Sequence, residues 1–212
     1  MAQHPSTPQL DFWRGEFGQH YIIRNDTNPV IMRSLIGLWA RIMRCMEGAP
    51  PQSILEVGAN IGRHLRVLRT QSAARLLAVE PIAEARSILL QDQVVEPENL
   101  WDANLGALPL ADGQCDMVFT CTVLIHVHPD QLEQAYRELY RVSNRYIVTI
   151  EYFADKPETI PYRGHENMLF KRDFGGYWLD LYPDLRLLDY GFAWKRFTQL
   201  DNLTWWVFEK RP

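Results

Sequence analysis

A ten-residue stretch, 53–62, with the sequence SILEVGANIG, constrains the fold of this chain more than any other. Its apolar half fits a buried strand, and Glu56 lies near the strand's end. Gly58 and Gly62 bracket the turn that follows, and a helical pattern begins after it. Such a turn lets backbone N–H groups and the positive end of a helix approach a ligand closely. The stretch therefore predicts a ligand-binding turn, and the alternative is simple packing of a strand against a helix.

The spacing of the glycines does not match the dinucleotide fingerprint G-x-G-x-x-G. Counted from Gly58, that fingerprint requires glycines at the positions of Asn60 and Arg63. The pattern E-x-G-x-N-x-G instead resembles motif I of class I S-adenosylmethionine (SAM) methyltransferases. The resemblance implies that the turn lies under the amino-acid end of SAM, with Glu56, Gly58, Asn60 and Gly62 as binding residues.

Composition indicates one ordinary globular domain. The chain has 212 residues, 47% of them hydrophobic, and a net charge of −4, which predicts no general attraction to nucleic acid or to an anionic membrane. Its three cysteines form no C-x-x-C pair, and the first residues do not resemble a signal peptide. We therefore expect a cytoplasmic protein with an N-terminal segment and lid over residues 1–27 and one domain over 28–212.

Apolar runs and helical patterns alternate along the rest of the chain. The first ten residues read as a flexible start, and Asn28 and Pro29 are typical of a helix N-terminus. With the first motif, this order resembles the Rossmann-like fold of class I methyltransferases. That fold implies a seven-stranded, mostly parallel sheet with an antiparallel edge strand and helices on both faces. The strands are expected at 53–57, 75–80, 99–104, 116–119, 145–153, 185–194 and 203–209.

Two acidic residues at strand ends extend the predicted SAM site. Glu80 follows Gly62 by 18 residues, close to the spacing of a carboxylate that binds a ribose diol. The family resemblance implies that Asp102 accepts a hydrogen bond from the adenine amino group and that the backbone of Ala103 pairs with a ring nitrogen. The alternatives are a charged strand end and ordinary turn chemistry. Asp116, before a later strand, is expected to brace a loop.

Three residues are candidates for taking a proton from the methyl acceptor. His126 belongs to an H-x-H pair, but no acidic or cysteine partner has ligand spacing nearby, so we predict no metal site. A histidine titrates near neutrality, which suits a general base, although packing is an equal alternative. Glu151 ends a predicted strand, and His165 lies in one of two predicted loops rich in Tyr, Arg, Lys and His.

The acceptor is expected to be a small, acidic molecule. Aromatic and polar residues of the N-terminal segment suit a lid, and guanidinium groups bind carboxylate or phosphate. The alternatives are packing of that segment and a solvated basic face. The predicted acceptor-binding residues are Trp13, Tyr21, Arg24, Asn25, Tyr152, Tyr162, Arg163, Lys171 and Arg172.

Several segments together resemble a bacterial family of pseudaminic acid biosynthesis-associated methylases. The resemblance implies methyl transfer from SAM, with S-adenosylhomocysteine as product, to a hydroxyl or amine of a sugar acid or nucleotide sugar. We expect a monomer or homodimer without nucleic-acid or membrane partners. The alternatives are a natural-product or amino-acid methyltransferase and a non-catalytic module that binds SAM or a partner. Residues that carry the resemblance are 12–13, 15–18, 21, 24–25, 56–62, 123–126, 143–147, 161–165, 170–174, 189–192 and 201–205.

Overall fold

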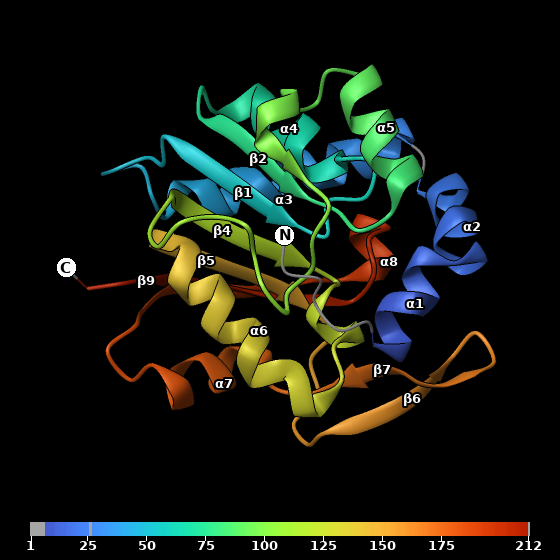
Figure 1. Ribbon diagram of the computed structural model, residues 1–212. Helices are drawn as coiled ribbons and strands as arrows, with labels where there is room; N and C mark the ends of the chain where they lie inside the picture. Colours follow the sequence, from blue (N-terminus) through green and yellow to red (C-terminus); the bar gives the residue numbers. More distant parts are fainter. Residues whose placement is uncertain (1–6, 26, 212) are drawn as a thin grey trace.

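A computed structural model describes residues 7–25 and 27–211. Its central feature is a seven-stranded sheet with strand order β3-β2-β1-β4-β5-β9-β8 (Figure 1). The strands of this sheet are β1 (Ser53–Val57), β2 (Arg75–Val79), β3 (Leu100–Trp101), β4 (Cys115–Cys121), β5 (Ser143–Glu151), β8 (Arg186–Ala193) and β9 (Leu203–Glu209).

The strand directions confirm the predicted Rossmann-like class I methyltransferase fold. Strands β1 to β5 are parallel to one another, whereas β9 pairs antiparallel with both β5 and β8. The reversed strand therefore lies one position in from the edge, and β8 forms the edge itself. Because β1, β2 and β4 are parallel and adjacent, the turns after all three emerge at the same side of the sheet.

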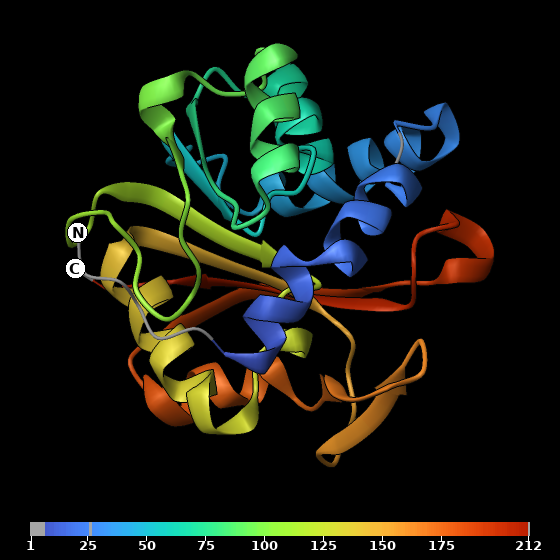
Figure 2. The ribbon, with the colours of Figure 1, turned by 45° about the vertical axis from the view of Figure 1, so that its right-hand side comes forward.

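Helices cover both faces of the sheet (Figure 2). One face packs against α3, α4 and α5, and the other against α6 and α7. The predicted cap of α3 is confirmed, since the side chain of Asn28 accepts a hydrogen bond from the N–H of Val30 at 2.9 Å. These helices are α3 (Pro29–Arg44), α4 (Arg63–Gln71), α5 (Ala83–Gln91), α6 (Pro129–Val142) and α7 (Phe174–Leu181), with η1 (Pro97–Asn99), η2 (Leu124–His126) and α8 (Lys195–Thr198) in the connections.

The amino and carboxyl ends of the parallel strands have different roles. At the amino end of β4, Asp116 braces neighbouring segments as predicted: its Oδ2 accepts the N–H of Gln52 at 2.8 Å and its Oδ1 the amide of Asn144 at 3.2 Å. The carboxyl ends of the strands are left for the turns that surround a cavity. No helix in the described part of the chain has the length and apolarity that a bilayer crossing requires.

The structure differs from the predicted loops and flexible start in two places. The region around His165 is a hairpin of β6 (Glu158–Tyr162) and β7 (His165–Lys171), followed at once by α7. Its register shifts at Pro161, which lacks an N–H for pairing, and this proline conceals the strand in the sequence. Residues 8–10 of the predicted flexible start belong to a helix, while residues 1–6 lie outside the described residues. The two N-terminal helices are α1 (Pro8–Arg14) and α2 (Glu16–Arg24).

Candidate cofactor and acceptor site

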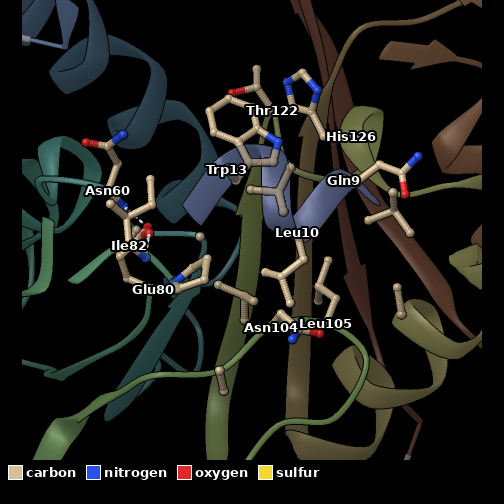
Figure 3. A pocket seen from close by; sticks show the side chains of 18 of the residues that line it. Gln9, Leu10, Trp13, Asn60, Glu80, Ile82, Asn104, Leu105, Thr122 and His126 are labelled. Atoms are coloured by element: carbon tan, nitrogen blue, oxygen red, sulfur yellow. Dashed lines mark hydrogen bonds between the residues drawn. The ribbon is translucent and has the colours of Figure 1, made fainter. Parts of the chain in front are cut away.

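A cavity of about 390 Å³ lies at the carboxyl ends of β1, β2 and β4, under the N-terminal helices. Its size is in the range of small-molecule sites. Figure 3 shows Leu10 and Trp13 of α1 over the cavity, with Glu80 on one side and His126 on the other. The lining brings together residues from six distant segments, namely 7–25, 56–64, 80–82, 103–106, 121–127 and 130–135.

The glycine turn after β1 forms the floor at one end of this cavity. Gly58 and Gly62 have φ values of +80° and +75°, in the region that side chains disfavour. Asn60 also has a positive φ, of +48°, and its side-chain oxygen accepts the N–H of Ile61 at 2.7 Å. Asparagine tolerates this conformation, which explains how it replaces a glycine of the usual motif.

Glu80 ties the ends of β1 and β2 together. Its Oε2 accepts the N–H of Asn60 at 2.6 Å, and its Oε1 accepts the N–H of Ile82 at 2.7 Å (Figure 3). Burial raises the pKa of Glu80 to about 7, against the effect of these two hydrogen bonds. Each carboxyl oxygen keeps a second lone pair, so the group that shapes the turn is also able to accept a hydroxyl of a ligand.

Two charged residues flank the glycine turn. Glu56 is 2% exposed, and no group among the described residues hydrogen-bonds its Oε2. Burial raises the pKa of Glu56 well above its usual range, with the charge of Glu80 acting in the same direction. Arg63, at the start of α4, also lines the cavity. The sequence alone gave Arg63 no role in binding, because it indicated only that the third glycine of the dinucleotide fingerprint is absent.

His126 lies in the lining with a defined tautomer. Its Nδ1 is 2.6 Å from the carbonyl oxygen of Met168 in β7, so Nδ1 carries the proton and Nε2 keeps a lone pair. The ring packs against Trp13 at 4.8 Å and Tyr162 at 5.0 Å between centroids. Burial lowers the pKa of His126 to about 4, which keeps the ring neutral at physiological pH.

Glu151 lies behind His126 rather than in the lining. This fully buried carboxylate accepts backbone N–H groups of Val123, Leu124 and Ile125 at 3.1, 3.0 and 3.4 Å, and the hydroxyl of Thr120 at 3.2 Å. Burial raises the pKa of Glu151 to about 7, although these hydrogen bonds oppose the shift. The carboxylate thus holds η2, the short helix that carries His126.

The N-terminal helices and the hairpin close the cavity together. Trp13, Tyr21 and Asn25 all line it, and the amide of Gln9 donates to the carbonyl of Asn167 in β7 at 3.2 Å. An aromatic cluster joins α1, α2, η2 and the hairpin. Its members are Phe12, Trp13, Phe17, Tyr21, His126, Tyr162 and His165.

Asp102 and Ala103 are placed differently, although they are adjacent in the chain. Ala103 lines the cavity, whereas Asp102 is exposed and pairs with Arg14 of α1 and Arg86 of α5 at 2.8 and 2.9 Å. The predicted contact of Asp102 with adenine stays a prediction.

The other predicted acceptor residues surround the cavity without lining it, within residues 7–25 and 27–211. Arg24 lies over the rings of Phe17 and Tyr21, and Arg163 is at the tip of the hairpin. Tyr152 donates to Asp201 at 2.7 Å. His165 is exposed and contacts Phe12, while Tyr162 contacts His126. Lys171, the last residue of β7, and Arg172, which follows it, are half-buried.

The lining also includes residues that sequence reasoning missed. Thr122 follows β4 with a φ of +55°, an uncommon value for a β-branched residue, and such strain is concentrated at functional sites. Leu10 and Leu105 provide apolar surface, and Gln131 provides an amide on α6. Only the apolar periodicity of α1 could have indicated Leu10, because the others depend on tertiary structure. No group of three or more His, Cys, Asp or Glu side chains suited to a metal ion occurs within the described residues.

Comparison with known proteins agrees with this geometry. Residues 55–145 match the family model described as a methyltransferase domain. No curated protein matches the chain in sequence. Among solved structures, the 1,6-didemethyltoxoflavin-N1-methyltransferase of Burkholderia thailandensis, with bound 1,6-didemethyltoxoflavin and S-adenosylhomocysteine, has a TM-score of 0.71 and 14% identity. The match covers 100% of this chain and 94% of that one.

Two further structures show how widely the fold is used. The magnesium protoporphyrin IX methyltransferase of Synechocystis PCC 6803, with bound SAM, has a TM-score of 0.66 and 13% identity over 99% of this chain and 100% of its own. The [4+2]-cyclase SpnF has a TM-score of 0.60 and 12% identity over 82% and 80%. At such identities the likeness shows the fold alone, and the family match adds the domain type. Residues 55–145 therefore match a methyltransferase domain, and the chain has the Rossmann-like fold of the class I methyltransferases.

Proposed function

We propose that this chain transfers the methyl group of SAM to a hydroxyl or amine of a small molecule, with His126 as the proton acceptor. The observation that carries the proposal is the tautomer of His126 in the cavity lining. Met168 holds the proton on Nδ1 at 2.6 Å, so the Nε2 lone pair is the basic position of the ring.

The residues present fit SAM. A turn with positive φ at Gly58 and Gly62 lets a ligand approach the backbone, and Glu80 has lone pairs for a ribose diol. Glu56 has a buried oxygen without a partner among the described residues. When bound, SAM supplies a methyl group on a positively charged sulfur, which leaves that sulfur with the electron pair of the broken bond.

The chain's own residues then have two tasks. The first is to align the acceptor, for which Trp13, Leu10 and the other cavity residues restrict its position and exclude water. The second is to take the proton that the acceptor loses as its oxygen or nitrogen gains the methyl group. Because burial lowers its pKa to about 4, His126 is neutral and a weak base, and Nε2 is the ring position that would take this proton. Glu151 supports this role by holding η2 in place.

The residues that line the cavity also bear on the chemical class of the acceptor. An acidic sugar-type acceptor was predicted from Arg24, Arg163, Lys171 and Arg172, but none of these side chains lines the cavity within the described residues. Along α6 the lining includes the amides of Gln131 and Gln134, the methyl group of Ala135 and the carboxylate of Asp130, which disfavours an anionic acceptor there. We therefore favour a neutral, flat acceptor of the natural-product type, such as the 1,6-didemethyltoxoflavin that the Burkholderia thailandensis enzyme binds. The acidic acceptor is the second candidate.

Turnover of an acceptor panel tests this proposal. Purified protein is incubated with SAM and neutral heteroaromatic or acidic sugar acceptors, and S-adenosylhomocysteine is quantified by mass spectrometry. His126→Asn keeps a donor for Met168, and we expect it to lower kcat about 100-fold or more while the Kd for S-adenosylhomocysteine stays the same. His20→Asn, at an exposed position of α2, is the matched control. Full activity of His126→Asn would exclude the proton-transfer role, and a folded protein that binds no S-adenosylhomocysteine would exclude the function.

A further inference from the structure

The edge strand β8 and the short helix α8 that follows it expose four aromatic side chains. Tyr190, Phe192, Trp194 and Phe197 are 63%, 57%, 53% and 84% exposed. Tyr190 and Phe192 are two residues apart in β8 and therefore point to the same face of the sheet. Single exposed apolar residues are ordinary on a protein surface, but a run of four aromatic residues is typical of a surface that another molecule covers.

The backbone of β8 is open to pairing as well. Within the described residues β8 pairs with β9 alone, so its outer side has no partner strand. Proteins commonly protect such an edge with proline, lysine or a very short strand, yet β8 has eight residues and contains neither proline nor lysine. Its bulge between Leu187 and Asp189 leaves a regular stretch from Asp189 to Ala193. The N–H of Tyr190 is bonded to the side chain of Asp189 at 2.8 Å, a local bond that a second strand would replace.

The two ends of β8 carry opposite charges that have no ion pair within residues 7–25 and 27–211. Asp184 lies just before the strand and Arg196 just after it, and both are exposed. By contrast, the neighbouring Arg186 and Lys195 already have acidic partners in the same chain. Counted outward from Tyr190, Asp184 and Arg196 are each six residues away. The charges are thus arranged symmetrically about the middle of the strand, with opposite signs.

We propose that β8 pairs antiparallel with β8 of a second copy of this chain, about a two-fold axis at Tyr190, to form a homodimer. In such an interface the same patch meets itself, and the end of one strand lies beside the start of the other. Arg196 of each copy therefore comes near Asp184 of the second copy, at both ends of the contact. A register centred on Gly191 would instead bring Arg196 near Arg186, so the charges favour Tyr190 as the centre. The exposed aromatic residues of the two copies lie on one face of the joined sheet and cover one another.

Reversal of the two charges tests both the partner and the register. Sedimentation velocity over a range of protein concentrations measures the dimer, which we expect for the unaltered protein at micromolar concentration. Arg196→Asp and Asp184→Arg each create two like-charged contacts in the dimer and should raise its dissociation constant about 10-fold or more. An equimolar mixture of the two variants should restore the dimer, because each chain then supplies the charge that the other lacks. Arg33→Asp, at an exposed position of α3, is the matched control.

A second variant tests the strand edge itself. Phe192→Lys places a charge in the middle of the contact and should weaken the dimer, whereas Leu90→Lys, at an exposed apolar position of α5, should not. Thermal melting verifies that every variant is folded. A monomer at every concentration would overturn the inference and leave the aromatic edge to a different partner. A dimer that neither charge reversal weakens, or a mixture that associates no better than its components, would also overturn it.

The inference is independent of the proposed function. Among the described residues, β8 and α8 contribute nothing to the cavity lining. The variants should therefore leave the Kd for S-adenosylhomocysteine within about twofold of the unaltered protein. Failure of the unaltered protein to bind S-adenosylhomocysteine would contradict the proposed function without bearing on the dimer.

Discussion

The guanidinium of Arg14, at the end of α1, lies 2.8 Å from the carboxylate of Asp102, just after β3. These residues are 88 positions apart in sequence, and their pairing fastens an N-terminal helix beside the cavity. Asp102 also pairs with Arg86 at 2.9 Å, so a single carboxylate joins three elements. The side chains of Arg14 and Asp102 are 42% and 51% exposed, which limits each ion pair to about 1 kcal/mol or less.

Loss of this ion pair should speed ligand release. We expect Arg14→Met to raise the dissociation rate of S-adenosylhomocysteine by up to about fivefold, because α1 is then held less firmly over the cavity. Stopped-flow fluorescence of Trp13 and the other tryptophans measures the rate, and Arg33→Met is the control. Equal rates in the two variants would show that the ion pair does not restrain α1. A much larger effect of Asp102→Ala than of the double variant Arg14→Met/Arg86→Met would instead support direct contact of Asp102 with adenine.

Replacement of Glu151 should affect both stability and turnover. Glu151→Gln retains an oxygen for some of the N–H groups of η2 but directs an NH₂ group toward another donor. We expect a loss of about 1–3 kcal/mol in the free energy of unfolding and a lower kcat, with little change in the Kd for S-adenosylhomocysteine. Urea unfolding and steady-state kinetics measure these effects, with the exposed Glu158→Gln as control. Unaltered stability and kcat would refute the supporting role.

Replacing Gly62 and Gly164 by alanine separates the cost of backbone strain from the cost of steric crowding, because both have a positive φ but only Gly62 is crowded. Gly62 and Gly164 have φ values of +75° and +85°. A Cβ at Gly62 would lie 2.6 Å from Leu89 and 2.7 Å from Val94, whereas one at Gly164 would meet nothing within 4 Å. Gly164→Ala should therefore cost about 1 kcal/mol from strain, and Gly62→Ala a further 1–3 kcal/mol or so from overpacking. Urea unfolding compares them, and equal costs would mean that the core beside Gly62 adapts freely.

His64 should make stability depend on pH in the acidic range. Its Nδ1 accepts the indole N–H of Trp39 at 3.0 Å, and burial lowers its pKa from 6.5 to about 3. Between these values the unfolded chain binds a proton that the folded chain does not, so His64 makes the protein less stable as the pH falls. His64→Asn keeps an acceptor for Trp39 but does not titrate.

The comparison of His64→Asn with the unaltered protein isolates this effect. Since the other titrating groups are shared, the stability difference between the two proteins should shift in favour of the variant as the pH falls from about 7 to about 4.5. Urea unfolding at several pH values measures the difference. A difference that stays constant would show that folding does not lower the pKa of His64.

Local chemistry was sufficient to predict individual strands and the glycine turn, whereas the arrangement of the sheet was implied by the family resemblance. The strand around Leu55 is a short apolar run, and the cap at Asn28 needs only its immediate neighbours. The hairpin was missed because Pro161 interrupts its pattern and because its strands are largely exposed. The helices α1 and α2 were missed as helices because they have only 7 and 9 residues, so an apolar periodicity has little length over which to repeat.

The positions of charged side chains were harder to predict from the sequence than the strands were. Asp102 was expected at adenine, but its partner Arg14 comes from a distant helix that the sequence did not place. Arg163 and Arg172 are near aromatic residues in sequence, yet the hairpin holds them outside the lining. Arg63 had one local signal, a cation at the start of a helix, and this signal has meaning only once its surroundings are known.

The contact between His126 and Met168 constrains how this protein is able to vary. A strand alternates its two sides at every residue, so a single insertion in β7 between Met168 and α7 would turn a different carbonyl toward the imidazole or remove it. Additional residues beyond the tip at Arg163 and Gly164 would leave that register intact. Relatives that share this chemistry should therefore differ in the length of the hairpin tip while keeping the number of residues between Met168 and α7 constant.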